Sequence, residues 1–488
     1  MNEKGPRLTA DAMRRSGLCV GCGACAGAGV VMALDRYGEL APRSEARAAA
    51  IRNVAPICPF SPHAANEDDI SNRRFAEAAS SHPMIGRFEA AYVGHAAEDG
   101  FREAGSSGGL VSWVAVELLR RGLVDGVAHI VPLQNPLPDG RLFDYRISRR
   151  VEDVRAGAKS RYHPVELSRV IAEIRETPGR YAVVGIPCFV KAIHLLRRRD
   201  PLLRARIAFL LGLFCGHMKS ARLGESFAWQ LGVPPGRMTG IDYRLKNTER
   251  PANWYRAHIS HLDGAPREQD WWNLVDGDWG AGFFQNSACD FCDDVVAETA
   301  DVSFGDAWLE PYASDGRGTN VVVVRSPLIQ RLLERATEEA RVELQEVDAD
   351  FVLRTQQAGL RHRREGLAYR LALRVKSRRA IQPRKRVAPN RNLPLRRKLV
   401  YRARRQIAVW SRRIYPLARR LDALWVYLLW ARAAGAAYGA VTYGRGRLGA
   451  AFDQLERLSR SFGLVRDAGA HSSQPKSRRM EQHDAPEV

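Results

Sequence analysis

The residues of this chain best suited to metal chemistry are its eight cysteines, which fall into two sets of four. The first set is Cys19, Cys22, Cys25 and Cys58, and Pro59 follows its last member. Thiolates spaced two residues apart can wrap one face of a cubane iron–sulfur cluster, and a distant Cys-Pro supplies the fourth ligand. Four thiolates also suit zinc, although zinc sites favour paired Cys-x2-Cys knuckles over a triple run. We therefore expect a 4Fe-4S cluster here, with zinc as the alternative.

The second set is Cys188, Cys215, Cys289 and Cys292. Cys188 and Cys215 each come shortly after an expected strand, and the ends of parallel strands converge on one edge of a sheet, where ligands bind. Cys289 and Cys292 form a Cys-x2-Cys pair in a loop before another expected strand. We expect a second 4Fe-4S site, the alternative being that these thiols are small apolar groups of the core.

A glycine- and serine-rich loop at 105–109 precedes an expected helix and is a candidate for binding phosphate. Its residues are Gly105, Ser106, Ser107, Gly108 and Gly109. Backbone amides at a helix N-terminus favour an anion, and glycine lets the backbone approach it closely. The pattern is neither the dinucleotide-binding fingerprint nor a Walker loop, so an ordinary turn is an equal alternative.

A second candidate segment at 159–162 combines two cations, a hydroxyl and an aromatic ring. Its residues are Lys159, Ser160, Arg161 and Tyr162. It could bind phosphate and stack on a ring system, or it could be a solvated charged loop. Asp306, Thr319 and Asn320 lie at strand ends, where an edge-of-sheet site is expected. Lys246 belongs to a further group whose role stays open, and no residue is identified as a catalytic acid.

The elements that position these residues read as an α/β fold. We expect an N-terminal ferredoxin-like cysteine module, a mostly parallel or mixed sheet with flanking helices, and a basic helical C-terminal extension. Expected strands are 90–94, 124–131, 181–185, 207–214, 302–305 and 320–325, and expected helices include 110–121 and 328–343. The expected boundaries are 1–65 for the cysteine module, 85–360 for the α/β domain, 361–394 for a basic linker, 395–465 for the helical extension and 466–488 for a disordered tail.

Charge is concentrated at the C-terminal end. The 488 residues carry a formal net charge of +21, while residues 361–488 hold 31 Lys+Arg and 8 Asp+Glu, a net of +23, which leaves −2 for residues 1–360. Hydrophobic residues make up 45% and charged residues 26%, values that exclude a wholly disordered chain. There is no apolar export signal and no run of about 20 apolar residues, so we expect a cytoplasmic protein.

The extension from residue 399 carries an apolar stripe with Trp410 and Trp425 beside a face of arginines. A basic helix with aromatic residues suits an anionic membrane surface. Packing of the helix on the body is an equal alternative, and nucleic-acid binding is less favoured. The expected location is therefore cytoplasmic, with peripheral attachment to the inner membrane face as one interpretation.

Taken together, these segments resemble the coenzyme F420 hydrogenase/dehydrogenase beta-subunit family over about residues 15–350. The matching segments are the first cysteine set, 106–109, 185–188, 215–217, 289–292 and 305–308. One departure is that Cys25 is followed by Ala26 and Gly27 rather than by an early proline, which leaves room for one cluster in this module.

The resemblance implies an FAD enzyme with 4Fe-4S clusters, for which two are expected, and flavin contacts near 105–109 and 159–162. Electrons would pass between a ferredoxin, another redox partner or a deazaflavin coenzyme, the clusters and FAD, to reduce or oxidise an unknown substrate. The alternatives are a non-catalytic electron-transfer subunit of a larger complex and a zinc-stabilised binding protein.

Overall fold

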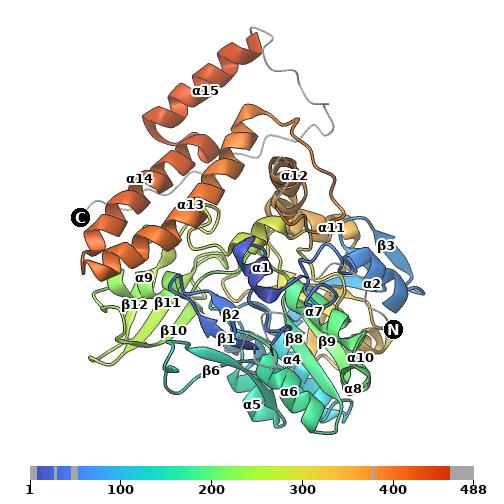
Figure 1. Ribbon diagram of the computed structural model, residues 1–488. Helices are drawn as coiled ribbons and strands as arrows, with labels where there is room; N and C mark the ends of the chain where they lie inside the picture. Colours follow the sequence, from blue (N-terminus) through green and yellow to red (C-terminus); the bar gives the residue numbers. More distant parts are fainter. Residues whose placement is uncertain (1–7, 27–29, 45–52, 376–379, 462–488) are drawn as a thin grey trace.

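A computed structural model describes residues 8–26, 30–44, 53–375 and 380–461 (Figure 1). Its centre is an eight-stranded mixed sheet in the order β15-β5-β14-β13-β9-β8-β6-β7. The strands are β5 (Ala90–Ala96), β6 (Gly126–Pro132), β7 (Phe143–Ser148), β8 (Tyr181–Gly185), β9 (Ile207–Leu213), β13 (Val302–Asp306), β14 (Asn320–Val324) and β15 (Val342–Glu346). Strands β13, β9, β8 and β6 run parallel, and the outer pairings are antiparallel. The expected α/β fold with a mixed sheet is confirmed.

Both faces of the sheet are buried, which is why its central strands are almost continuously apolar. On β14, Val322 and Val324 pack in one core with α4 (Leu110–Arg120) and α10 (Pro327–Glu338), while Val321 and Val323 face another core. Under β8 and β9, α6 (Ser168–Glu176) and α7 (Pro187–Arg197) contribute to the largest core. Smaller helices of the domain are α3 (Phe101–Ala104), α5 (Val151–Ala156), α8 (Pro201–Arg206) and α9 (Arg222–Gln230).

Three strand features differ from the sequence expectations, and the first is the edge strand β7, which was not anticipated. The helix expected over 328–343 ends at Glu338, and Val342–Glu346 instead forms β15 beside β5. A three-stranded antiparallel sheet was not anticipated; it comprises β10 (Met238–Leu245), β11 (Arg256–His261) and β12 (Arg267–Asp270). Its strands mix charged and apolar side chains with bulged pairing, so their alternation is weak in the sequence.

The N-terminal module is built from α1 (Ala10–Arg15), the hairpin β1 (Val30–Leu34) and β2 (Leu40–Ser44), and α2 (Glu67–Arg74). Helix α2 begins at Asn66, which forms a capping box with Asp69. A short hairpin, β3 (Ser80–His82) and β4 (Gly86–Phe88), leads into the central sheet.

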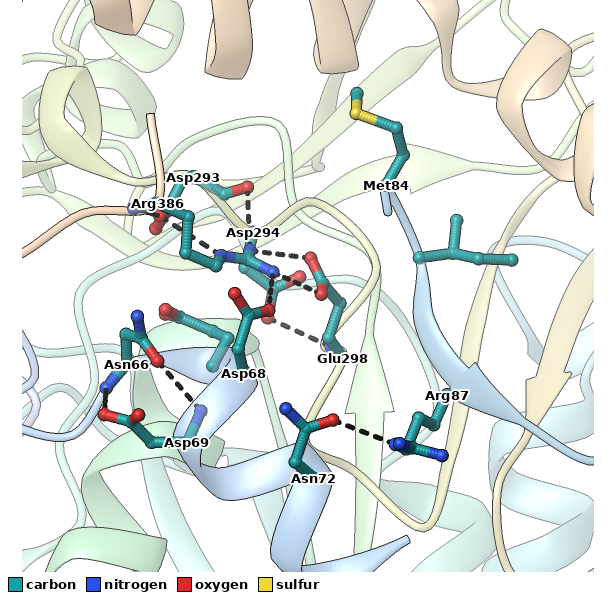
Figure 2. Close-up of polar contacts among 12 residues, drawn as sticks. Asn66, Asp68, Asp69, Asn72, Met84, Arg87, Asp293, Asp294, Glu298 and Arg386 are labelled. Atoms are coloured by element: carbon teal, nitrogen blue, oxygen red, sulfur yellow. Dashed lines mark hydrogen bonds and ion pairs between the residues drawn. The ribbon is translucent and has the colours of Figure 1, made fainter. Parts of the chain in front are cut away.

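The segment expected as a linker is in part a helix. After α11 (Ala349–Thr355), α12 (Gln357–Arg374) runs through the first part of 361–394 and buries Arg363 and Arg370, so its arginines do not mark a solvated connection. Residues 380–394 then cross the body without regular structure. Figure 2 shows the Arg386 side chain between Asp293, Glu298 and Asp68.

The C-terminal extension consists of α13 (Leu395–Arg420), α14 (Leu424–Tyr443) and α15 (Gly446–Ser461). Helices α13 and α14 lie side by side (Figure 1), and α13 continues through Pro416. Tyr415 and Tyr427 are fully buried against the body. One face of these helices therefore packs on the body, as the packing alternative expects. In the described part of the chain no helix combines the length and apolar character needed to cross a bilayer. The tail expected at 466–488 lies outside the described residues.

Candidate functional site

The first four cysteines converge on one cavity, and we refer to Cys19, Cys22, Cys25 and Cys58 as the N-terminal quartet. They line a cavity of about 30 Å³ whose other walls are apolar or glycine residues such as Met13, Val20 and Val54. None of the eight cysteines of the chain forms a disulfide. The thiols are therefore free to act as ligands together.

Two glycines allow the loop between these cysteines to turn. Gly21 and Gly23 both have positive φ, of 72° and 78°. A Cβ on Gly21 would lie 2.5 Å from the carbonyl oxygen of Leu40, and one on Gly23 would meet the Glu166 carboxylate. The backbone carbonyl of Cys22 also accepts a hydrogen bond of 3.0 Å from the Leu167 amide. The loop is thus held directly against the α/β domain.

The second four cysteines also come together, although they are far apart in sequence. Cys188 lies in the first turn of α7 rather than in the expected turn, Cys215 follows β9, and Cys289 belongs to the short helix η3 (Ser287–Phe291). Each thiol of this set interacts electrostatically with the others. We call Cys188, Cys215, Cys289 and Cys292 the inner quartet.

The thiols of both quartets are hard to ionise in the absence of a bound cation. Burial, followed by repulsion from neighbouring cysteines, raises the pKa of Cys22 and Cys188 well above the ordinary value. Burial raises the pKa of Cys58 to about 12, and that of Cys289 to about 11. A metal that binds these sulfurs as thiolates must therefore displace their protons.

The two quartets are neighbours. Cys188 of the inner quartet interacts electrostatically with Cys22 of the N-terminal quartet. No group of three or more described His, Cys, Asp or Glu side chains is arranged to hold a single metal ion. The eight thiols thus form two adjacent sets in one region of the protein.

The loop at 105–109 follows the short helix α3 and leads into α4. Within the described residues, no protein acceptor receives the backbone N–H groups of Ser106, Ser107, Gly108 and Gly109. The loop is fixed from outside, since Ser107 Oγ donates to the Thr319 carbonyl at 3.0 Å and Asn320 Oδ1 accepts from the Leu110 amide at 3.2 Å. Its free amides are therefore held in position for an anion.

The segment at 159–162 lies against this loop, because the Ser160 amide donates to Ser106 Oγ at 2.8 Å. Lys159, with a φ of 119°, donates to the Arg244 carbonyl at 3.3 Å and pairs with Asp242. Arg161 packs over the Phe143 ring at 5.1 Å. The structure thus brings together the two phosphate-binding candidates.

Asp306 joins the same region through a cation that the sequence did not reveal. Arg244, which is 5% exposed, donates to both carboxylate oxygens of Asp306 at 3.1 and 3.2 Å. Lys246 donates to the carbonyls of Arg102, Ser107 and Arg317, and burial lowers its pKa to about 8. Arg244 comes from the unanticipated strand β10, so only its spatial position reveals it, whereas Lys246, which the sequence singles out, directly follows that strand.

Aromatic side chains connect this region with the inner quartet. The Trp279 ring lies 4.7 Å from that of Tyr162 and is stacked on His217 at 4.2 Å. A Cβ on Gly216, the residue after Cys215, would lie 2.9 Å from Trp279 Nε1. Trp279 therefore contacts both the 159–162 segment and the loop that carries Cys215.

The chain is similar to known proteins over most of its α/β domain. Two family models describe the N-terminal and the C-terminal parts of the coenzyme F420 hydrogenase/dehydrogenase beta subunit; they match residues 91–172 and 179–350 respectively, together more than half of the chain. No curated protein matches the chain in sequence. A solved chain from the F420-reducing [NiFe] hydrogenase complex of Methanosarcina barkeri is 15% identical, with a TM-score of 0.47 over 63% of this chain and 99% of that one. The protein belongs to the coenzyme F420 hydrogenase/dehydrogenase beta-subunit family, and its role is redox electron transfer.

Proposed function

We propose that this protein is an iron–sulfur flavoenzyme that holds two 4Fe-4S clusters and FAD and relays electrons to or from a substrate. The observation that carries the proposal is the gathering of all eight cysteines into two adjacent quartets. None of these cysteines forms a disulfide, so all eight sulfurs can serve as thiolate ligands once a metal displaces their protons. The external donor is proposed to be a ferredoxin, another one-electron protein or a deazaflavin coenzyme.

The residues around the 105–109 loop fit the diphosphate of FAD. Four backbone amides of the loop have no acceptor among the described residues, and Lys159 and Lys246 add positive charge beside them. Tyr162 and Trp279 offer rings on the side that leads to the inner quartet. We propose that the loop binds phosphate and that the 159–162 segment contacts the rest of the flavin.

When bound, FAD would exchange two electrons with a substrate and the clusters would exchange single electrons with partners. The residues of the chain hold these groups near one another and exclude water. Trp279 fixes the spacing between the inner quartet and the 159–162 segment, because it packs on both. Leu167 fixes the N-terminal quartet by its hydrogen bond to the Cys22 carbonyl.

Anaerobic purification tests the proposal directly. We expect a brown protein with about eight iron and eight sulfide per chain and one FAD, since each 4Fe-4S site takes four cysteines. A colourless protein that contains zinc and no flavin would rule out the proposal.

Single-cysteine variants test each quartet separately. Cys22→Ala is expected to lose one of two cluster signals in electron paramagnetic resonance and to retain FAD. Cys292→Ala is the matched variant for the other quartet and is expected to lose the second signal. Unchanged iron content in both variants would contradict the assignment of the ligands.

A non-catalytic electron-transfer subunit is the second candidate, because the family description names a subunit. Reduction of the bound flavin by reduced ferredoxin, reduced deazaflavin or nicotinamide nucleotides distinguishes the two candidates when combined with a search for substrate turnover. The subunit role is supported if the bound flavin is reduced rapidly but the protein turns over no small-molecule substrate unless a partner protein is present.

We further propose that α13 and α14 attach the protein to an anionic membrane surface. Their solvent-facing residues combine large apolar side chains with arginines: Trp410, Leu417, Leu421, Trp425 and Leu429 are exposed, as are Arg402, Arg405, Arg413, Arg420 and Arg432. Aromatic and leucine side chains can enter the interface while arginines bind the acidic headgroups. The opposite faces of the same helices pack on the body. The packing interpretation therefore concerns the buried faces, and the membrane proposal concerns the exposed ones.

Surface variants are better than truncation for testing this, because removal of α13 would expose the body residues that pack on Tyr415 and Ser411. We expect Trp410→Ser with Trp425→Ser to reduce co-sedimentation with phosphatidylglycerol vesicles several-fold. Trp272→Ser, which changes an exposed tryptophan outside these helices, is the control. Equal binding by all forms, or equal binding to phosphatidylcholine, would contradict the proposal.

A further inference from the structure

Helix α12 brings a buried guanidinium against the inner quartet. Arg363 is 1% exposed, and its two terminal nitrogens donate to the carbonyls of Cys289 and Gly216. It also interacts electrostatically with all four thiols of the inner quartet. Arg363 therefore places a positive charge directly beside this site.

Carbonyl oxygens rather than a carboxylate hold Arg363. Among the described residues it forms no ion pair with aspartate or glutamate, and its two terminal nitrogens are satisfied by the carbonyls of Cys289 and Gly216. Its positive charge therefore stays beside the inner quartet.

Other charges act on the inner quartet as well. Lys385, which interacts with Cys292, forms an ion pair of 2.9 Å with Asp293, and buried Lys219, which interacts with Cys289, donates to the Phe283 carbonyl at 2.7 Å. The carboxylates of Asp290, Asp293 and Asp294 act on cysteines of this quartet with the opposite sign. Arg363 is thus one charge among several, and substitution at this residue isolates its own effect.

We propose that Arg363 raises the reduction potential of the cluster that the inner quartet would hold, relative to the same site without this guanidinium. A nearby positive charge stabilises the reduced form, which carries one more negative charge. The inference rests on the proposed function and adds to it a residue of this chain that would set the potential of one cluster.

Arg363 is a feature of the C-terminal part of this chain. It lies beyond residue 350, where the match to the family ends. The positive charge is thus supplied by α12, a helix that the family match does not include. Arg363 acts on the site through its charge and is not a ligand.

A redox titration followed by electron paramagnetic resonance tests the proposal on the full-length holoprotein. We expect Arg363→Gln to move the midpoint potential of one cluster to a more negative value by about 59 mV or more, the one-electron equivalent of a tenfold change in equilibrium constant. Arg363→Lys, which keeps the charge, should stay near the wild-type value. Arg364→Gln is the matched control, because that neighbour is paired with Glu298 instead.

The outcomes separate the two proposals. Iron content equal to wild type with an unmoved potential in Arg363→Gln overturns the role of Arg363 and leaves the proposed function standing. A wild-type protein without iron overturns both. If Arg363→Gln fails to hold its inner cluster, Arg363→Lys decides: a midpoint potential more negative than wild type by about 59 mV or more in this charge-conserving variant overturns the inference.

Discussion

Replacing Arg386 by glutamine is expected to destabilise the protein by about 3–5 kcal/mol, because it removes the positive charge of one member of a buried ion-pair network. Arg386 donates to both oxygens of Glu298 at 2.6 and 2.8 Å and lies 3.4 Å from the Asp293 carboxylate (Figure 2). Both carboxylates are at most 1% exposed, so they would remain buried without this partner. The additional pair with Asp68 contributes little, since that carboxylate is 55% exposed.

The measurement is the free energy of unfolding in urea, followed by tryptophan fluorescence under anaerobic conditions. Arg384→Gln is the matched control two residues away, because its ion pair with Asp69 is exposed and its loss should cost less than about 1 kcal/mol. Equal destabilisation by the two variants, or a loss below about 1 kcal/mol for Arg386→Gln, would refute the reasoning from burial.

Three further predictions concern the loops and the pH dependence. Gly23→Ala should lower iron content by about half, since its Cβ would meet Glu166, whereas Gly122→Ala, at an open position with positive φ, should leave iron unchanged. Lys246→Met should weaken FAD binding about tenfold by releasing the 105–109 loop, measured by fluorescence titration; unchanged affinity would contradict the placement of the flavin. Burial lowers the pKa of His129 to about 4, so the unfolded chain binds more protons between about pH 6.5 and 4. The free energy of unfolding should therefore fall by up to about 3 kcal/mol as the pH drops through this window, and His129→Phe should reduce that fall.

The sequence predicts the central sheet well because buried strands such as Asn320–Val324 are runs of β-branched residues bounded by turns. It also predicts which cysteines could act together, since Cys-x2-Cys spacing is a local signal. It could not establish that Cys188 and Cys215 meet Cys289, because that depends on how strands distant in sequence are ordered.

The prediction of a basic linker over 361–394 failed where the charged side chains are buried. The arginines of α12 read as a solvated linker, yet Arg363 and Arg370 lie in the core, where carbonyl oxygens accept their N–H groups. Composition alone cannot distinguish a solvated arginine from one that is buried on backbone acceptors. For the same reason Arg244, which borders the candidate flavin site, left no recognisable signal in the sequence.

The crossing of residues 380–394 over the body has a consequence for the order in which contacts form during synthesis. Lys385 pairs with Asp293, the residue after Cys292, and Arg386 pairs with Glu298, so both contacts form only after the last cysteine has been translated. The nascent chain therefore holds all eight cysteines before this segment can pack beside Cys292.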